Sequence, residues 1–197
     1  MKRTLIAVLP CALWLGACAP TTDETATDSG ASGKQSTTEA ATDAKTTQIA
    51  SEDAQFMKEA AQSGMAEVKM GELGQSNGES QQVKAFSQRI VTDHTKANEE
   101  LKQLAAKKGV PLPDEMSEQH KTMIQHLSSL KGQEFENAFK QHAVENHQKS
   151  VEKFKTASEK AKDAELKTFA SKTLPVLQQH LELAKQLNAT PTATQPQ

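Results

Sequence analysis

Residues 79–105 are the stretch that most constrains the fold of this chain. Apolar side chains recur there at steps of three and four residues, the spacing of one helical face. They are Val83, Phe86, Ile90, Ala97, Leu101 and Leu104. Because a helix turns by about 100° per residue, His94 projects from the middle of this apolar face. The pattern predicts a long helix that carries an imidazole into the core of the protein.

Further segments show the same helical period, and no segment shows the alternation of a β-strand. We expect helices at residues 52–73, 79–107, 114–130, 133–162 and 164–187. Residues 74–78 read as a turn, and the short segment 114–130 lies between two pairs of longer helices. The sequence therefore predicts an all-α domain over residues 51–188, a four-helix bundle with a short extra helix in the connection between the two helix pairs.

Local features of the expected helices add detail to this prediction. Asp53 or Ser51 suits the N-cap of the first helix. Gly64 and Gly71 fall on the apolar face of that helix, where glycine costs about 1 kcal/mol relative to alanine. Two glycines on a buried face predict close approach of a neighbouring helix. Gly109 suits a left-handed cap after the second long helix.

The start of the chain predicts a bacterial lipoprotein leader over residues 1–17. Lys2 and Arg3 precede an apolar run at residues 5–17, which is shorter than the roughly 20 residues that span a bilayer. The run ends in Leu-Gly-Ala before Cys18, and this ending resembles the lipobox of bacterial lipoproteins. The resemblance implies that Cys18 becomes the first residue and carries the lipid. The alternative is ordinary signal cleavage, with Cys18 incidental.

The composition of residues 18–50 predicts a disordered tether between Cys18 and the domain. They are rich in Thr, Ser, Ala and Asp, and Ile49 is their one large aliphatic residue. They therefore cannot bury enough apolar surface to offset the entropy lost on ordering.

The acyl chains expected on Cys18 would stabilise membrane attachment by about 0.8 kcal/mol per buried CH₂. Ala19 rather than Asp follows Cys18, and the resemblance implies an outer-membrane lipoprotein that faces the periplasm. Residues 189–197 read as a loose polar tail.

Composition narrows the functional classes. The formal net charge of −2 gives no basic footprint for nucleic acid. The two cysteines are Cys11 and Cys18, so the domain has no disulfide or thiolate chemistry. The sequence carries no nucleophile–base motif, no glycine-rich phosphate loop and no zinc-protease signature. These observations favour a non-enzymatic role.

Three of the long helices each place a histidine within the apolar sector, at His94, His147 and His180. Glu67 lies at the margin of the apolar face of the first helix. Imidazole and carboxylate groups suit Zn, Cu or Fe. These four residues are therefore candidate ligands of a transition metal.

The alternative is that these histidines only pack in the core. They would then hydrogen-bond the backbone or one of three polar side chains, Asn98, Asn146 and Thr173. The topology bears on the choice. A long crossover before the second helix pair puts Glu67 and His180 at one level and His94 and His147 at the next, whereas a simple up-and-down order separates Glu67 from His180 by about 12 Å along the axis. Asp93 is expected on the hydrated side.

Several phrases, taken together, resemble one bacterial family. They are residues 65–68, 83–86, 91–98, 107–113, 147–151 and 174–180, with sequences MAEV, VKAF, VTDHTKAN, KKGVPLP, HQKSV and LPVLQQH. The chain is similar over about residues 54–187 to the domain of unknown function 4142. The resemblance implies a predicted outer-membrane or periplasmic protein with a ferritin-like bundle, and it brings no established activity.

A ferritin-like di-iron site uses Glu-x-x-His on two helices. The residues three positions before the inward histidines are Val91, Val144 and Leu177. The sequence therefore argues against a di-iron carboxylate site. We expect a membrane-anchored envelope lipoprotein with a non-enzymatic role, either binding an envelope protein partner or supporting the envelope. The alternative is a metal-binding or metal-handling periplasmic protein.

Overall fold

A computed structural model describes residues 49–189 of the chain, all of them within the unit 45–197. The expected leader, Cys18, the tether up to residue 48 and residues 190–197 of the tail lie outside the described residues. The described part contains five helices and no strand. They are α1 (Ser51–Asn77), α2 (Gln81–Lys107), α3 (Glu118–Ser129), α4 (Gly132–Lys160) and α5 (Ala164–Ala189). The all-α prediction is confirmed.

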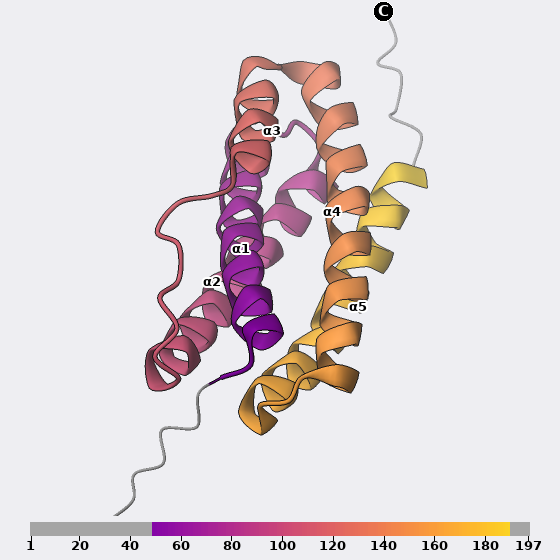
Figure 1. Cartoon of the computed structure of the whole chain (residues 1–197). Helices are drawn as coiled ribbons and strands as arrows, with labels where there is room; N and C mark the ends of the chain where they lie inside the picture. Colours follow the sequence, from indigo (N-terminus) through magenta and orange to yellow (C-terminus); the bar gives the residue numbers. More distant parts are fainter. Residues whose placement is uncertain (1–48, 190–197) are drawn as a thin grey trace, which may run out of the picture. The chain divides into compact units, whose positions relative to one another are not determined.

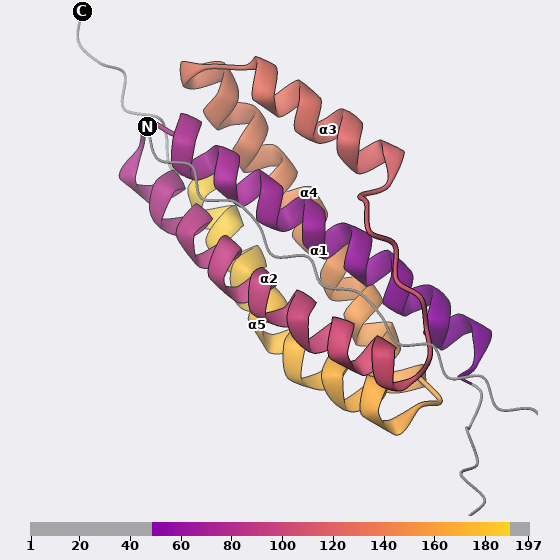
Figure 2. The same cartoon turned by 90° about the vertical axis from the view of Figure 1, so that its left-hand side faces the viewer.

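The four long helices form two hairpins that pack against each other. α1 pairs with α2, and α4 pairs with α5 (Figure 1). Between the hairpins, α1 contacts α4 and α2 contacts α5, while α3 lies over α1 and α4 (Figure 2). Within residues 49–189, none of the helices combines the length and the apolar character that crossing a membrane requires.

A buried carboxylate near the start of α4 holds the loop between α1 and α2. The Oε1 atom of Glu136 accepts hydrogen bonds from the backbone N–H groups of Glu79 and Ser80, at 2.9 and 2.5 Å. These contacts hold the pKa of Glu136 below its usual value, although burial acts in the opposite direction. The beginning of α4 is thereby fixed at the end of the domain where α1 turns into α2.

A second buried carboxylate makes the reciprocal contact at the other end. The Oδ2 atom of Asp53 accepts hydrogen bonds from the backbone N–H groups of Lys162 and Asp163, at 2.9 and 2.7 Å, in the loop between α4 and α5. The expectation that Asp53 or Ser51 caps α1 is wrong, because the N-cap is Ala50 and makes no side-chain cap bond. Asp53 instead ties the start of α1 to the opposite hairpin.

These two contacts define the direction of each helix. α1 begins beside the α4–α5 loop, and α4 begins beside the α1–α2 loop. Hence α1 and α5 run the same way, and residues 108–131 cross the length of the domain between the hairpins (Figure 2). The structure has the long crossover, which is one of the two topologies that the sequence left open.

Some helix ends follow the sequence and others do not. α2 ends as predicted, because Gly109 has a φ of 66° and the N–H of Val110 bonds the carbonyl of Ala105 at 2.9 Å. The expected turn at residues 74–78 is wrong, because α1 continues to Asn77 with Gly74 buried inside it. Tertiary contact decides there, since Gly74 faces Phe139 of α4. α3 begins at Glu118 rather than at residue 114.

The core consists of two apolar clusters. One contains Met70, Val83, Phe86, Ile90, Phe135, Phe139, Ala143 and Ala184 among its buried residues. The other contains Met57, Ala61, Leu101, Ala105, Leu166 and Phe169. His94, His147 and His180 each lie, along their own helix, between residues of the first cluster and residues of the second. The centre of the domain is therefore a polar layer between two apolar ends.

Glycines on α1 permit the close approach of the helices, as the sequence predicted. A Cβ at Gly71 would lie 3.1 Å from the backbone oxygen of Ser87, and the side chain of Asn98 covers Gly64. A Cβ at Gly74 would lie 2.7 Å from Cε2 of Phe139 and closer still to Oγ of Ser87. These positions have no room for a side chain.

We therefore expect Gly74→Ala to destabilise the protein, although alanine favours the helix by about 1 kcal/mol. Overpacking against the Phe139 ring costs about 1–3 kcal/mol, so a net loss on the order of 1 kcal/mol should appear in urea unfolding. Gln75→Ala, at the exposed neighbouring position of α1, is the control and should leave the unfolding free energy nearly unchanged. A Gly74→Ala protein at least as stable as the wild type would contradict this packing.

Candidate metal centre

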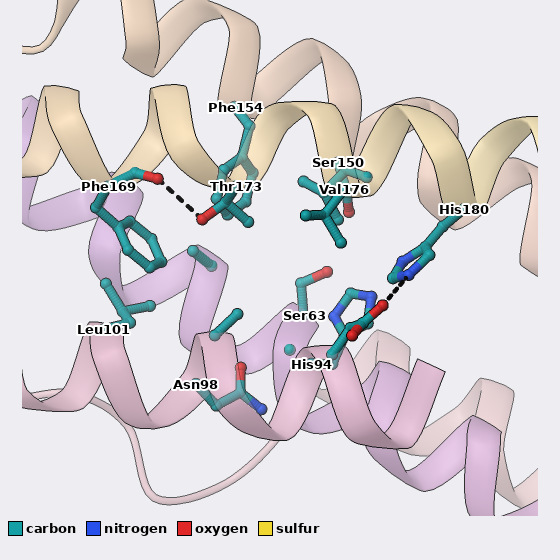
Figure 3. A pocket seen from close by; sticks show the side chains of 15 residues that line it. Ser63, His94, Asn98, Leu101, Ser150, Phe154, Phe169, Thr173, Val176 and His180 are labelled. Atoms are coloured by element: carbon teal, nitrogen blue, oxygen red, sulfur yellow. Dashed lines mark hydrogen bonds and ion pairs between the residues drawn. The ribbon is translucent and has the colours of Figure 1, made fainter. Parts of the chain in front are cut away.

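Three imidazole rings from three helices meet in the polar layer. His94 comes from α2, His147 from α4 and His180 from α5, and all three are buried. The ring centroids lie 5.5 Å apart for His94 and His147, 5.4 Å for His94 and His180, and 5.3 Å for His147 and His180. Figure 3 shows His94 and His180 side by side from facing helices. The apolar periodicity of each helix carries its ring inward, and the crossover topology brings the rings to one level.

The rings offer one nitrogen each within a small space. One ligand atom from each histidine lies within 4.8 Å of those of the other two. A tetrahedral metal with bonds of about 2.0–2.1 Å holds its nitrogen ligands about 3.4 Å apart. To bind one ion together, ligand atoms that lie within 4.8 Å of one another would have to approach to about 3.4 Å.

Hydrogen bonds on the outer side fix the tautomer of two rings. Nδ1 of His147 lies 2.8 Å from the carbonyl oxygen of Ala143, one turn earlier in α4. A carbonyl only accepts, so Nδ1 of His147 donates this hydrogen bond, and in the neutral ring Nε2 keeps the lone pair. Nε2 of His180 lies 2.8 Å from Oδ2 of Asp93. When the His180 ring is neutral and donates to that carboxylate, its Nδ1 atom keeps the lone pair.

Burial keeps two of the rings neutral. It lowers the pKa of His94 well below the usual 6.5, and the neighbouring His147 and His180 lower it further. Burial also lowers the pKa of His180 to about 4, although the hydrogen bond from its ring to Asp93 acts in the opposite direction. Neutral imidazole is the form that binds metals, so these rings are ready ligands at neutral pH.

Each ring has one buried nitrogen without a hydrogen-bond partner among the described residues. These atoms are Nε2 of His94, Nε2 of His147 and Nδ1 of His180. A buried polar atom without a partner costs about 1–3 kcal/mol, and native structures contain few of them. Three such atoms on adjoining rings form a donor set that one metal ion would satisfy together.

Glu67 lies beside this cluster rather than within it. The sequence placed it at the margin of the apolar face, but it is only 1% exposed. Its Oε2 atom is 3.9 Å from Nδ1 of His147, the nitrogen that already donates to Ala143. Burial raises the pKa of Glu67, while His147 and a hydrogen bond from Asn146 lower it. The structure thus places Glu67 behind the His147 ring, outside the group of three ligand atoms.

Asp93 is the site residue that the sequence reasoning missed. It was expected on the hydrated side, yet its side chain is 32% exposed and its Oδ2 atom holds the His180 ring. Arg89 lies 3.4 Å from the same oxygen and donates to Gln179 at 2.6 Å. The place of Asp93 directly before His94 was the available signal, because one helical step from His94 turns the Asp93 side chain toward the neighbouring α5.

The three polar side chains named as alternative partners of the rings have other roles. Thr173 donates to the carbonyl of Phe169 at 2.9 Å, and the Nδ2 group of Asn146 lies 3.4 Å from Sδ of Met123. Asn98 covers Gly64. The rings' hydrogen bonds within the described residues go to Ala143 and Asp93, on the outer nitrogens of His147 and His180.

The buried rings predict an acid-sensitive fold. Unfolded His180 binds a proton below about pH 6.5, whereas the folded ring binds one only near pH 4. Between these values the unfolded state holds more protons, so the free energy of unfolding of the metal-free protein should fall as pH falls from 6.5 to 4. At 1.36 kcal/mol per pKa unit, His180 contributes on the order of 3 kcal/mol. His94 acts in the same direction.

Urea unfolding at a series of pH values measures this effect. Glu67 acts in the opposite sense, because its raised pKa lets the folded state keep a proton longer. The difference between the wild type and His180→Gln isolates the imidazole, and the variant should show the weaker loss between pH 6.5 and 4. Equal pH dependence in the two proteins would show that burial does not hold the His180 ring neutral.

Comparison with solved structures shows that the fold occurs elsewhere. The crystal structure of a DUF305 fragment from Deinococcus radiodurans superposes with a TM-score of 0.64 at 14% identity, covering 71% of this chain and 97% of that chain. CopM in its Cu(II)-bound form superposes with a TM-score of 0.60 at 18% identity, covering 69% and 95%. At these identities the likeness is one of fold alone.

Comparison with sequence families identifies the chain more directly. No curated protein matches it. Residues 38–187 match the family described as Domain of unknown function (DUF4142), which extends over most of the chain and includes all five helices up to the last turn of α5. The chain therefore belongs to the DUF4142 family.

Proposed function

We propose that this domain binds a single transition-metal ion between His94, His147 and His180. The observation that carries the proposal is the meeting of three buried rings, each with one nitrogen that lacks a hydrogen-bond partner in the described structure. Three helices supply the ligands, so the ion would join the two hairpins at the centre of the domain. Binding would then stabilise the fold as well as hold the metal.

The donor chemistry favours copper or zinc. Imidazole nitrogen suits Zn, Cu, Fe and Ni, and among divalent ions Cu²⁺ binds nitrogen sites most tightly. The three-residue group contains no carboxylate, which the harder ions prefer. The likeness to CopM in its Cu(II)-bound form supports the same class of ion, although it extends only to the fold. Of the metals that the sequence suggested, copper and zinc remain the better candidates.

Outer contacts would hold the ligands in place. Metal-binding histidines commonly donate their second nitrogen to a carboxylate or a backbone carbonyl, which fixes the ring orientation. Asp93 supplies a carboxylate to His180, and Ala143 supplies a carbonyl to His147. We propose that Glu67, behind the His147 ring, balances the charge of the bound ion rather than binding it.

We further propose that the four long helices form a ferritin-like four-helix bundle. The single long crossover between the hairpins supports this assignment, because ferritin-like bundles have one such connection. The role remains proposed as non-enzymatic metal binding, in keeping with the absence of catalytic motifs from the sequence. A structural role through an envelope protein partner is the second candidate, and it rests on the expected membrane anchor alone.

Metal analysis of the full chain, purified without a histidine tag, tests the principal proposal. The wild type should hold about one equivalent of Cu(II) or Zn(II) after dialysis and melt at a higher temperature with metal than without. His94→Ala should lose the bound metal and the shift. His142→Ala is the matched control, because His142 lies half-buried on α4 outside the cluster, and it should behave as the wild type. The wild type and both variants keep the same cysteines, Cys11 and Cys18, so any metal bound by thiol groups is the same in all three proteins.

Equal metal content in wild type and His94→Ala would contradict the proposal, and so would loss of metal in His142→Ala alone. The second outcome would move the ion to the surface pair His126 and His142, whose ring centroids are 6.5 Å apart.

The proposed location is the outer membrane, through a lipid on Cys18. We expect Cys18→Ser to move the protein from the membrane fraction to the soluble periplasmic fraction or to block its processing, because the acyl chains provide the attachment. Cell fractionation and mass spectrometry of the mature amino terminus measure both effects. Cys11→Ser, within the expected leader, is the control and should leave lipidation intact. Membrane attachment that survives Cys18→Ser would exclude this anchor.

A further inference from the structure

We propose that the bound metal keeps one coordination position open toward an adjoining cavity, and that this position takes a small exogenous ligand of one to three heavy atoms. The ligand class comprises water, hydroxide and small anions such as azide. This inference rests on the proposed metal site and adds to it an exchangeable ligand.

The cavity adjoins two of the three rings. It has a volume of about 30 Å³, and His94 and His180 line it whereas His147 does not. Figure 3 shows these two rings at one end and Phe169 and Leu101 at the other. A cavity needs about 10–15 Å³ to hold one water, so this space holds roughly two water-sized groups. An ion held between the rings would face this cavity on the side that His147 leaves uncovered.

Within residues 49–189, three histidines form the group of ligands, and no fourth ligand atom belongs to it. Neither nearby carboxylate is placed to complete the set, because Asp93 holds the outer nitrogen of His180 and Glu67 lies behind the His147 ring. Zinc sites with four protein ligands are closed and structural, whereas sites with three keep a position for water or another small molecule. The donor count therefore points to an open site.

The lining of the cavity fits a small polar ligand. Four of its residues carry hydroxyl or amide groups, namely Ser63, Asn98, Ser150 and Thr173. Asp93 is its one charged residue, and that carboxylate is engaged with His180. Apolar side chains complete the wall, including Leu101, Phe154 and Phe169. The volume excludes larger substrates, and the hydroxyl groups of Ser63 and Ser150 offer donors to a ligand bound at the metal, whereas that of Thr173 donates to Phe169.

A surface pocket adjoins this cavity. Ser63 of α1 and Ser150 of α4 line both the cavity and a surface pocket of about 300 Å³. Residues of α3, including His120 and Met123, also line that pocket. The cavity and the surface pocket therefore adjoin at these two serines, and the proposed path for ligand exchange runs past them.

Azide titration of the Cu(II)-loaded full chain tests the inference. Azide bound to copper produces a ligand-to-metal charge-transfer band and changes the electron paramagnetic resonance spectrum, so neither readout depends on activity. The wild type should bind one azide per copper, saturably. Ala97→Val fills the cavity one turn from His94 and should keep its copper while azide affinity falls by about tenfold or more. Ala106→Val, exposed on the same helix, should match the wild type.

Copper at one equivalent without any spectral response to azide would overturn the open position and leave the metal site standing. Unchanged azide affinity in Ala97→Val would overturn the assignment of the ligand to this cavity. Ala60→Val fills the same cavity from α1 and replaces Ala97→Val if that protein does not fold. If the wild type binds no copper, the proposed metal site is wrong, and the proposed open position is wrong with it.

Discussion

Three imidazole rings packed against one another in the centre of the domain are the constraint on which the rest of the structure depends. They form a polar layer between two apolar clusters, where an unpaired polar atom is costly. On the outer side, hydrogen bonds satisfy one nitrogen of two rings: the carbonyl of Ala143 accepts from His147, and the carboxylate of Asp93 pairs with His180. On the inner side one nitrogen of each ring has no partner within the described residues. A neutral ring with a free lone pair is the form in which histidine binds a metal.

The architecture sets the level at which the rings meet. Asp53 and Glu136 each join the start of one hairpin to the loop of the other, and these reciprocal contacts fix how far the hairpins slide. A slip of one helical turn would move a ring by about 5.4 Å and separate the three nitrogens. The glycines of α1 serve the same end, because they let α2 and α4 approach closely. The carboxylates and glycines thus position the helices that carry the histidines.

The inward direction of the rings was predictable because a helix has a fixed period and an apolar face must be buried. The choice of crossover was not, since either topology buries the same faces. Glu67 was placed at a face margin, and it is buried because α4 covers that margin with His147. Asp93 was assigned to solvent; its place directly before His94 indicates on which side of α2 it lies, but its contact with His180 depends on the position of α5. Gly74 reads as a turn residue, and contact with Phe139 keeps it helical.

Anomalous diffraction at the copper absorption edge, from crystals of the Cu(II)-loaded protein, is the most direct test of the central claim. The account predicts one strong peak between the three rings, within bonding distance of one nitrogen each from His94, His147 and His180. A peak at the surface pair of His126 and His142, with none between the buried rings, would contradict it.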